Sequence, residues 1–153
     1  MKKLLPLLLL FTLFISCSKD DAQIVDYTAQ NEKEITDFIT LNKLNAQRSA
    51  SGLYYVINNP GTGIQPNATS NVTVAYKGTF TNGTIFDQST NAGISIGLNQ
   101  VIKGWTEGIQ YFKEGGSGLL LIPAHLGYGS YDYQGIPGGS VLIFEITLIS
   151  VNQ

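Results

Sequence analysis

The feature that most restricts the fold is a hairpin pattern in residues 71–88. In "NVTVAYKGTF", every second residue belongs to the less polar of two alternating sets. This set consists of Val72, Val74, Tyr76 and Gly78. This period of two is typical of a β-strand with one buried face. The segment "TNGT" follows directly, and its Asn-Gly pair is the strongest short-range signal for a tight hairpin turn. The chain is therefore expected to contain an antiparallel sheet.

Further strand patterns surround this hairpin from residue 50 onward. They are "GLYYVIN" before it and "GISIG", "SGLLLIP" and "SVLIFEITLISV" after it, and the last could be central in the sheet. The 17 glycines, eight tyrosines and seven phenylalanines of the chain suit strands and tight turns. Only "VIKGWTEGIQYF" is typical of a short helix. Residues 50–153 are predicted to form an α+β domain of about five antiparallel strands and one short helix.

A helical pattern precedes the sheet in "NEKEITDFITLNKLNA", residues 31–46. Four apolar positions follow helical spacing: Ile35, Phe38, Ile39 and Leu44. Asn31 is a plausible N-cap, and Glu32 and Glu34 are expected in the first turn, where they suit the helix dipole. We predict an N-terminal helix within residues 31–49 that either packs on the domain or serves as a dimerisation arm.

The first 16 residues, "MKKLLPLLLLFTLFIS", combine two lysines with an apolar run that is short for a membrane span, so they are expected to be a signal peptide. The only cysteine, Cys17, follows directly, and "FISC" resembles a bacterial lipobox. We expect Cys17 to be acylated rather than a buried thiol, with residues 17–30 as a tether. "SKDD" resembles export signals of Bacteroidetes surface lipoproteins. The expected location is the bacterial envelope, at the outer membrane, facing the periplasm or the cell surface.

Composition and motifs argue against several function classes. The net charge is −2 and no basic cluster stands out, which argues against nucleic-acid binding. His125 is the only histidine and is expected in a surface loop, because no nucleophile-elbow motif accompanies it. The sequence also lacks H-E-x-x-H, paired cysteines and the lysine of a P-loop. We therefore expect neither a cofactor nor a metal.

Aromatic and aliphatic residues instead gather near the predicted turns. They are Phe86, Val101, Ile102, Trp105, Tyr128, Ile136 and Phe144, with Asp87 beside Phe86. Small-ligand pockets are mostly apolar and contain few polar groups. These residues could therefore line one apolar pocket, and the single tryptophan could be its floor. They could equally be ordinary core residues.

In order, "VTVAYKGTFTNGTIFDQS", "GLNQVIKGWTEGI" and "IPAHLGYG…GIPGGSVLIFEITLI" resemble the FKBP-type peptidyl-prolyl cis-trans isomerases, over about residues 52–151. The resemblance implies a strongly bent sheet wrapped on the short helix. It also implies an isomerase of X-Pro bonds that assists folding of envelope proteins. Expected partners are proline-containing polypeptides, a membrane through acylated Cys17, and macrolide inhibitors. The alternative is a proline-segment binding module or chaperone in an envelope or gliding machine, with little turnover.

The resemblance also implies roles for individual residues. Trp105 would be the floor on which the proline ring rests. The walls would be Tyr76, Phe86, Val101, Ile102, Ile136 and Phe144. Tyr128 would offer its hydroxyl to the peptide carbonyl, and the Ile102 N–H would donate to bound ligands. Asp87 would hold Tyr76 or meet the twisting imide.

Two departures from the family pattern concern the pocket rim. Ala92 stands at a position that is often aromatic in the family, which would open one wall. Gly138 and Gly139 replace the usual Pro-Asn, so the loop "SYDYQGIPGG" is expected to be more flexible. Its tyrosines, Tyr131 and Tyr133, could extend the substrate surface.

Overall fold

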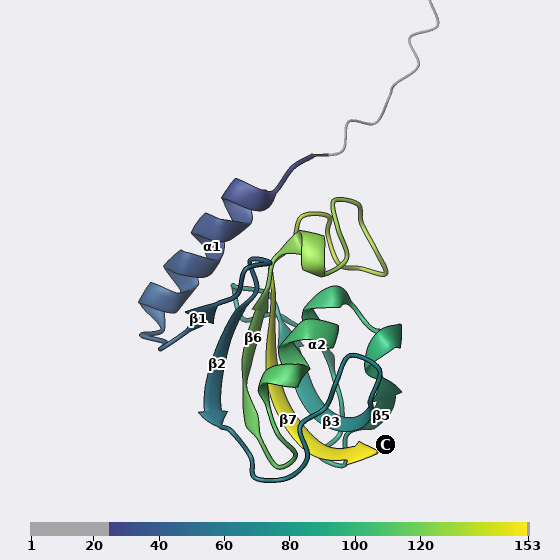
Figure 1. Ribbon diagram of the computed structural model, residues 1–153. Helices are drawn as coiled ribbons and strands as arrows, with labels where there is room; N and C mark the ends of the chain where they lie inside the picture. The colour runs from purple at the N-terminus through teal and green to yellow at the C-terminus, as the bar shows by residue number, and fades with distance from the viewer. Residues whose placement is uncertain (1–24, 153) are drawn as a thin grey trace, which may run out of the picture.

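The computed structural model describes residues 25–152 (Figure 1). The predicted signal peptide, Cys17 and the first part of the predicted tether lie outside this range. The helices are α1 (Thr28–Leu41) and α2 (Lys103–Gly108), with 3-10 helices η1 (Leu98–Gln100), η2 (Ile109–Tyr111) and η3 (Ala124–Leu126). The strands are β1 (Gln47–Arg48), β2 (Tyr54–Asn59), β3 (Asn71–Thr79), β4 (Ile85–Gln88), β5 (Ile94–Gly97), β6 (Ser117–Ile122) and β7 (Leu142–Asn152).

The seven strands form one antiparallel sheet in the order β1-β2-β6-β7-β3-β4, and β5 also pairs with β3. The α+β architecture and the predicted hairpin between β3 and β4 are confirmed, and β7 is central, between β6 and β3. The sheet has seven strands rather than about five. The difference comes from β1 and β4: β1 has only two residues, and β4 was expected only as the second arm of the hairpin, without an alternating pattern of its own.

The two helices cover opposite faces of the sheet. Leu120 and Ile122 of β6 belong to the core that contains Trp105 of α2, whereas Leu121 between them packs in the core that contains Ile35 of α1. The side chains of Leu120, Leu121 and Ile122 are all fully buried. A strand that is covered on both faces needs a continuous apolar run instead of alternation, which explains the sequence "LLLI".

The predicted limits of the N-terminal helix are wrong at both ends. The helix α1 begins at Thr28 and ends at Leu41, and residues 47–48 form a strand. The N-cap is Tyr27, so Asn31 lies inside the helix and is fully buried. Glu32 and Glu34 consequently fall beyond the first turn. The sequence indicates a local capping role for Asn31. In the structure, a tertiary contact fixes its position instead.

The apolar stripe of α1 is confirmed, and this chain's own sheet covers it. Ile35 is fully buried against Tyr54, Val56 and Ile143, and Phe38, Ile39 and Leu44 pack around it. Packing on the domain, rather than a dimerisation arm, therefore accounts for the stripe.

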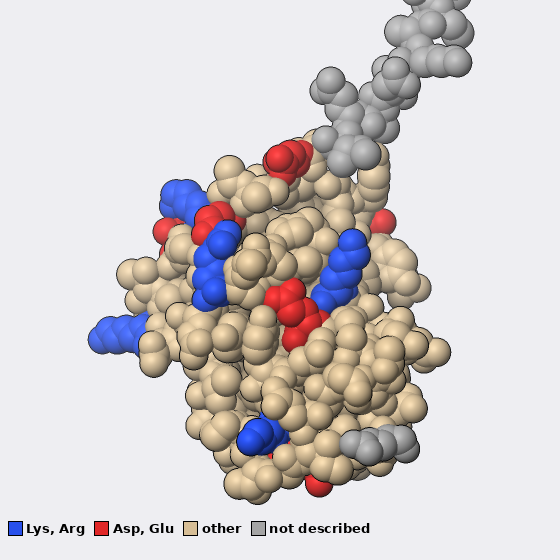
Figure 2. Space-filling model, viewed as in Figure 1, with Lys and Arg blue, Asp and Glu red and all other residues tan. Residues whose placement is uncertain are grey.

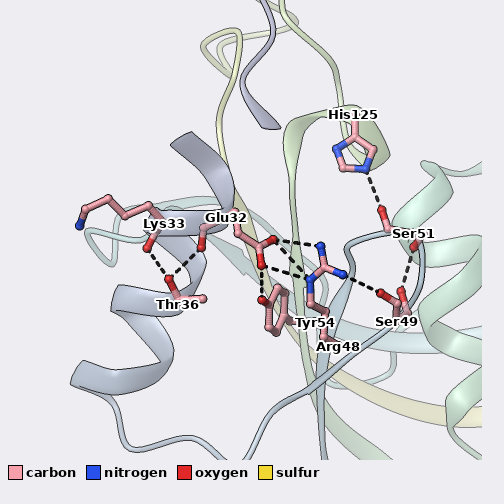
Figure 3. Close-up of polar contacts among 8 residues, drawn as sticks. All are labelled: Glu32, Lys33, Thr36, Arg48, Ser49, Ser51, Tyr54 and His125. Atoms are coloured by element: carbon pink, nitrogen blue, oxygen red, sulfur yellow. Dashed lines mark hydrogen bonds and ion pairs between the residues drawn. The ribbon is translucent and has the colours of Figure 1, made fainter. Parts of the chain in front are cut away.

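A small polar network also joins α1 to the sheet (Figure 3). The Tyr54 hydroxyl donates to Glu32 Oε1 at 2.6 Å, and Arg48 Nε lies 3.1 Å from the same oxygen. The hydrogen bond from Tyr54, together with Arg48, lowers the pKa of Glu32 below its ordinary value. The Glu32–Arg48 pair is half exposed, so solvent screens it and we expect it to add little to stability. The apolar contacts of Ile35 are the stronger attachment.

The surface is sparsely charged, and the charged groups in view are scattered among neutral ones (Figure 2). Lys77 and Glu145 form an ion pair across β3 and β7. Within residues 25–152, no helix is both long enough and apolar enough to cross a membrane.

Candidate functional site

The floor of the candidate site is the start of α2. The backbone N–H of Trp105 donates to the Ile102 carbonyl at 2.9 Å. This first turn fixes the position of the indole relative to Ile102. Two glycines allow α2 to lie directly on β6. A Cβ on Gly104 would be 2.5 Å from Cγ2 of Ile122, and one on Gly108 would be 2.6 Å from Cδ2 of Leu120. These two glycines therefore serve the close packing of α2 on β6.

Three aromatic rings meet edge to face at this floor. The Trp105 ring centroid lies 5.0 Å from that of Tyr76 on β3 and 5.2 Å from that of Phe144 on β7, with interplanar angles of 81° and 80°. Aromatic rings prefer this arrangement because the positive edge of one meets the negative face of another. The indole Nε1–H is buried and has no hydrogen-bond partner among the described residues. Buried unpaired donors are rare, and a functional site is one reason for keeping one.

A pocket of about 470 Å³ opens above the indole. Its lining residues are Tyr76, Asp87, Ile94, Ile96, Gln100, Val101, Ile102, Trp105, Tyr128, Tyr133 and Phe144. They come from β3, β4, β5, η1, α2, β7 and the segment after η3. Most of the lining side chains are apolar or aromatic, and Asp87 is the only charged one. The pocket therefore suits a small apolar group next to a few polar atoms.

One polar pair stands at the pocket edge. The Tyr76 hydroxyl donates to Oδ2 of Asp87 at 2.7 Å. Burial, followed by this hydrogen bond, raises the pKa of Tyr76 far above its ordinary value. The hydroxyl therefore remains protonated and fixes the Asp87 carboxylate.

Two stacked tyrosines form another part of the rim. The rings of Tyr128 and Tyr133 lie 4.8 Å apart, with an interplanar angle of 12°. Tyr128 is 38% exposed, so its hydroxyl can reach a bound molecule. Burial raises the pKa of Tyr128, which also keeps this hydroxyl protonated as a hydrogen-bond donor.

The structure brings seven of the nine predicted site residues to one pocket: Tyr76, Asp87, Val101, Ile102, Trp105, Tyr128 and Phe144. The other two, Phe86 and Ile136, line an adjoining hollow of about 530 Å³, which shares Asp87, Tyr128 and Tyr133 with the pocket. Their role as walls for a bound proline segment stays a prediction. The Phe86 ring packs edge to face against Phe144, with ring centroids 5.5 Å apart.

Three further residues line the pocket that the sequence patterns did not indicate: Ile94, Ile96 and Gln100. The alternation in "ISIG" already placed both isoleucines on one face of β5, but it could not show that this face borders the pocket. Ala92 is exposed and lies in the turn before β5, outside the pocket lining. It therefore opens no wall, because Ile94 and Ile96 form that side. Tyr133 does extend the rim, as suggested.

The remaining sequence expectations concern single groups. Ile102 directly precedes α2, and its N–H makes no hydrogen bond to another residue of the described chain. His125 is exposed in η3, with Nε2 at 2.9 Å from the Ser51 carbonyl oxygen, as expected of a surface position. Among residues 25–152, no group of three or more potential metal-binding side chains occurs.

Comparison with known proteins agrees with this geometry. Residues 62–149 match the family described as FKBP-type peptidyl-prolyl cis-trans isomerase. The chain is 38% identical over 128 residues to the FKBP-type peptidyl-prolyl cis-trans isomerase FkpA of Aeromonas hydrophila, covering 81% of this chain and 48% of that protein. The chain thus spans about half the length of this relative.

Solved structures give the same result. The crystal structure of FkpA from Escherichia coli superposes with a TM-score of 0.73 and 37% identity, covering 82% of this chain and 61% of that chain. The peptidyl-prolyl cis-trans isomerase from Pseudomonas syringae pv. tomato gives a TM-score of 0.71 and 35% identity, covering 82% of this chain and 96% of the other.

Proposed function

Because this chain belongs to the FKBP-type peptidyl-prolyl cis-trans isomerases, we propose that it catalyses rotation about X-Pro bonds in other polypeptides. The observation that carries the proposal is the apolar pocket floored by Trp105, with the Tyr76–Asp87 pair at its edge. The proline ring would rest on the indole, and the preceding residue would lie near Tyr128 and Tyr133.

The reaction needs no nucleophile, since no covalent bond is broken. The peptide C–N bond has partial double-bond character and a rotation barrier of about 18–20 kcal/mol. Uncatalysed X-Pro isomerisation therefore takes tens to hundreds of seconds. Only interactions that are stronger in the twisted transition state than in the planar amide accelerate this rotation. Each 1.36 kcal/mol of such a difference is about tenfold in rate.

The pocket offers two sources of that difference. The planar amide is more dipolar than the twisted one, so replacing water by apolar walls weakens the stabilisation of the planar state. The Ile102 N–H, the Tyr128 hydroxyl and the fixed Asp87 carboxylate are polar groups at the rim that would hold the peptide on either side of the rotating bond. A differential of about 4–5 kcal/mol would correspond to about a thousandfold or more.

We predict that Tyr76→Phe lowers kcat/KM for a Leu-Pro peptide by about three- to tenfold, because a hydrogen bond contributes about 0.5–1.5 kcal/mol net. The ring and its contacts with Trp105 are kept, so the loss reports on the fixed Asp87 carboxylate. Tyr55→Phe is the matched control: its hydroxyl donates to Gln47 at 3.0 Å, away from the pocket. Equal activities of the two variants would contradict the role of Asp87.

We also propose that the protein works at the bacterial envelope, held by a lipid on Cys17. The lipobox-like "FISC" after an apolar segment supports this. Stable anchoring would need more than one acyl chain, since a single chain gives only marginal membrane binding. Labelled palmitate should enter the wild-type protein and not Cys17→Ser in a bacterial host. Equal labelling of both proteins would contradict the proposal.

A refolding assay tests the enzymatic proposal. A protein whose refolding is limited by prolyl isomerisation should refold at a rate that rises linearly with the concentration of this protein. A macrolide inhibitor that competes for the pocket should suppress the increase. An unchanged rate over a wide concentration range would sink the proposal.

A further inference from the structure

We infer that Asn31 is a positioning residue for the pocket: its buried carboxamide ties α1 to both ends of the segment that carries Tyr128 and Tyr133. The inference deepens the proposed isomerase function and rests on it. Neither α1 nor Asn31 touches the pocket. Their effect on it would pass through residues 124–139, hereafter the rim segment.

The carboxamide of Asn31 bridges two backbone groups that lie 15 positions apart in the sequence. Its Nδ2 donates to the Gly139 carbonyl at 2.8 Å, and its Oδ1 accepts from the Ala124 N–H at 2.8 Å. Asn31 is fully buried, and both contacts are buried with it. Ala124 is the first residue of the rim segment and Gly139 is the last.

The rim segment is not paired with any strand of the sheet, and its contacts with the main core come from Leu126 and Ile136. It connects the end of β6 to the start of β7 and contains η3 but no strand of the sheet. Its ends are joined internally by the Gly129 N–H to the Ala124 carbonyl at 2.8 Å and the Gly139 N–H to the Gly129 carbonyl at 2.9 Å. Asn31 closes this loop from outside. Tyr128 lies directly before Gly129, so the positions of the two segment ends determine the position of Tyr128.

Residues just before Asn31 support the same contact. The Ser130 hydroxyl donates to the Val25 carbonyl at 2.7 Å. The Tyr27 ring packs so closely on Gly139 that a Cβ there would be 2.4 Å from Cε1. Gly138 is also enclosed, because a Cβ added there would lie 2.2 Å from the carbonyl oxygen of Ser130. Gly139 therefore lets the start of α1 approach the rim segment, and Gly138 lets two parts of the segment itself approach each other. Figure 1 shows the start of α1 beside this loop.

The α1 helix also contacts the β3–β4 hairpin, whose second strand carries Asp87. Glu34 accepts a hydrogen bond from Thr81, in the turn of the β3–β4 hairpin that leads to Asp87. One face of α1 thus contacts the two chain segments that bring Asp87 and Tyr128 to the pocket, while Ile35 attaches the helix to the sheet.

Asparagine is suited to this position because it has one donor group and one acceptor in a short, uncharged side chain. Alanine would leave a buried N–H and a buried carbonyl without partners, which is unfavourable unless the segment moves. We therefore expect Asn31→Ala to release the rim segment while the sheet remains folded.

The first test is kinetic, with Asn31→Ala compared to Ile35→Val and wild type in a Leu-Pro peptide assay. Misplacement of groups by about 1 Å can cost up to about a hundredfold, and we expect kcat/KM of Asn31→Ala to fall by about tenfold, mostly through KM. Ile35→Val loosens the same helix without touching the rim segment, so its kinetics should equal those of wild type. A purely structural role for Asn31 would lower the fraction of active protein, and hence the apparent kcat, with KM unchanged. That result would overturn the inference.

The second test uses wild-type protein and needs neither activity nor a variant. Amides that open in one cooperative unit exchange with similar opening free energies. The Gly129 and Gly139 amides should therefore exchange together with those in the middle of α1, at every denaturant concentration. Independent exchange of the two sets would overturn the inference even if the variant fails to fold. Inactive wild type would refute the isomerase proposal instead, and the exchange data would still decide whether α1 holds the rim segment.

Discussion

Trp105→Leu should lower kcat/KM for a Leu-Pro peptide by about 30- to 1,000-fold, the largest kinetic effect we expect from one substitution. Leucine keeps an apolar floor but removes the edge-to-face contacts with Tyr76 and Phe144. Each aromatic pair contributes about 0.5–1.5 kcal/mol beyond its buried area. Together with the lost contact to the proline ring, we expect about 2–4 kcal/mol of transition-state stabilisation to disappear.

Phe112→Leu is the control that separates this effect from loss of fold. Phe112 is fully buried in the same core as Trp105 but does not line the pocket. Both variants should lose about 1–3 kcal/mol of unfolding free energy in urea, as is usual for altered core residues. Only Trp105→Leu should lose activity at temperatures where both remain folded. Equal activities would mean that the indole is an ordinary core residue.

Gly118→Ala should be the most destabilising of the small substitutions, by about 3 kcal/mol or more. A Cβ at Gly118 would lie 1.9 Å from the Val56 carbonyl oxygen on the paired strand β2 and 2.8 Å from Cε1 of Phe112. Overpacking usually costs about 1–3 kcal/mol. Here the obstacle is backbone, so no change of rotamer can relieve it, and β2 must move away from β6.

Gly115→Ala is the matched comparison for urea unfolding. Gly115 has φ +82, and a Cβ there would meet nothing within 4 Å. Only the left-handed backbone conformation opposes alanine at this position, at a cost of about 1–2 kcal/mol. If the urea midpoint of Gly118→Ala were at or above that of Gly115→Ala, the close pairing of β2 and β6 at Gly118 would be contradicted.

Local patterns predicted the parts of the fold that depend on local chemistry. The alternation of β3 and the Asn-Gly turn specify a hairpin whichever core they join, and the stripe of α1 specifies a helix with one covered face. The first residue of α1 could not be predicted, because Asn31 is a residue type that is preferred at helix N-caps. Its buried partners, at Ala124 and Gly139, lie about a hundred residues away.

The site, too, could be predicted only in part. The order of the family motifs was enough to predict that Tyr76, Asp87, Trp105 and Tyr128 lie at one pocket. Asp87 lines the pocket with Tyr76, whereas Phe86 packs against Phe144 and lines the adjoining hollow. A family pattern thus indicates which segments meet, but the packing of the side chains decides which hollow each of them lines.

NMR exchange of a short Leu-Pro peptide is the experiment that shows whether this pocket accelerates X-Pro rotation. We predict cis–trans exchange much faster than in the free peptide, in proportion to protein concentration, and close to the uncatalysed rate with Trp105→Leu. Exchange near the uncatalysed rate with folded wild-type protein and bound peptide would contradict catalysis by this pocket. That result would identify the pocket as a site that binds proline segments without turning them over.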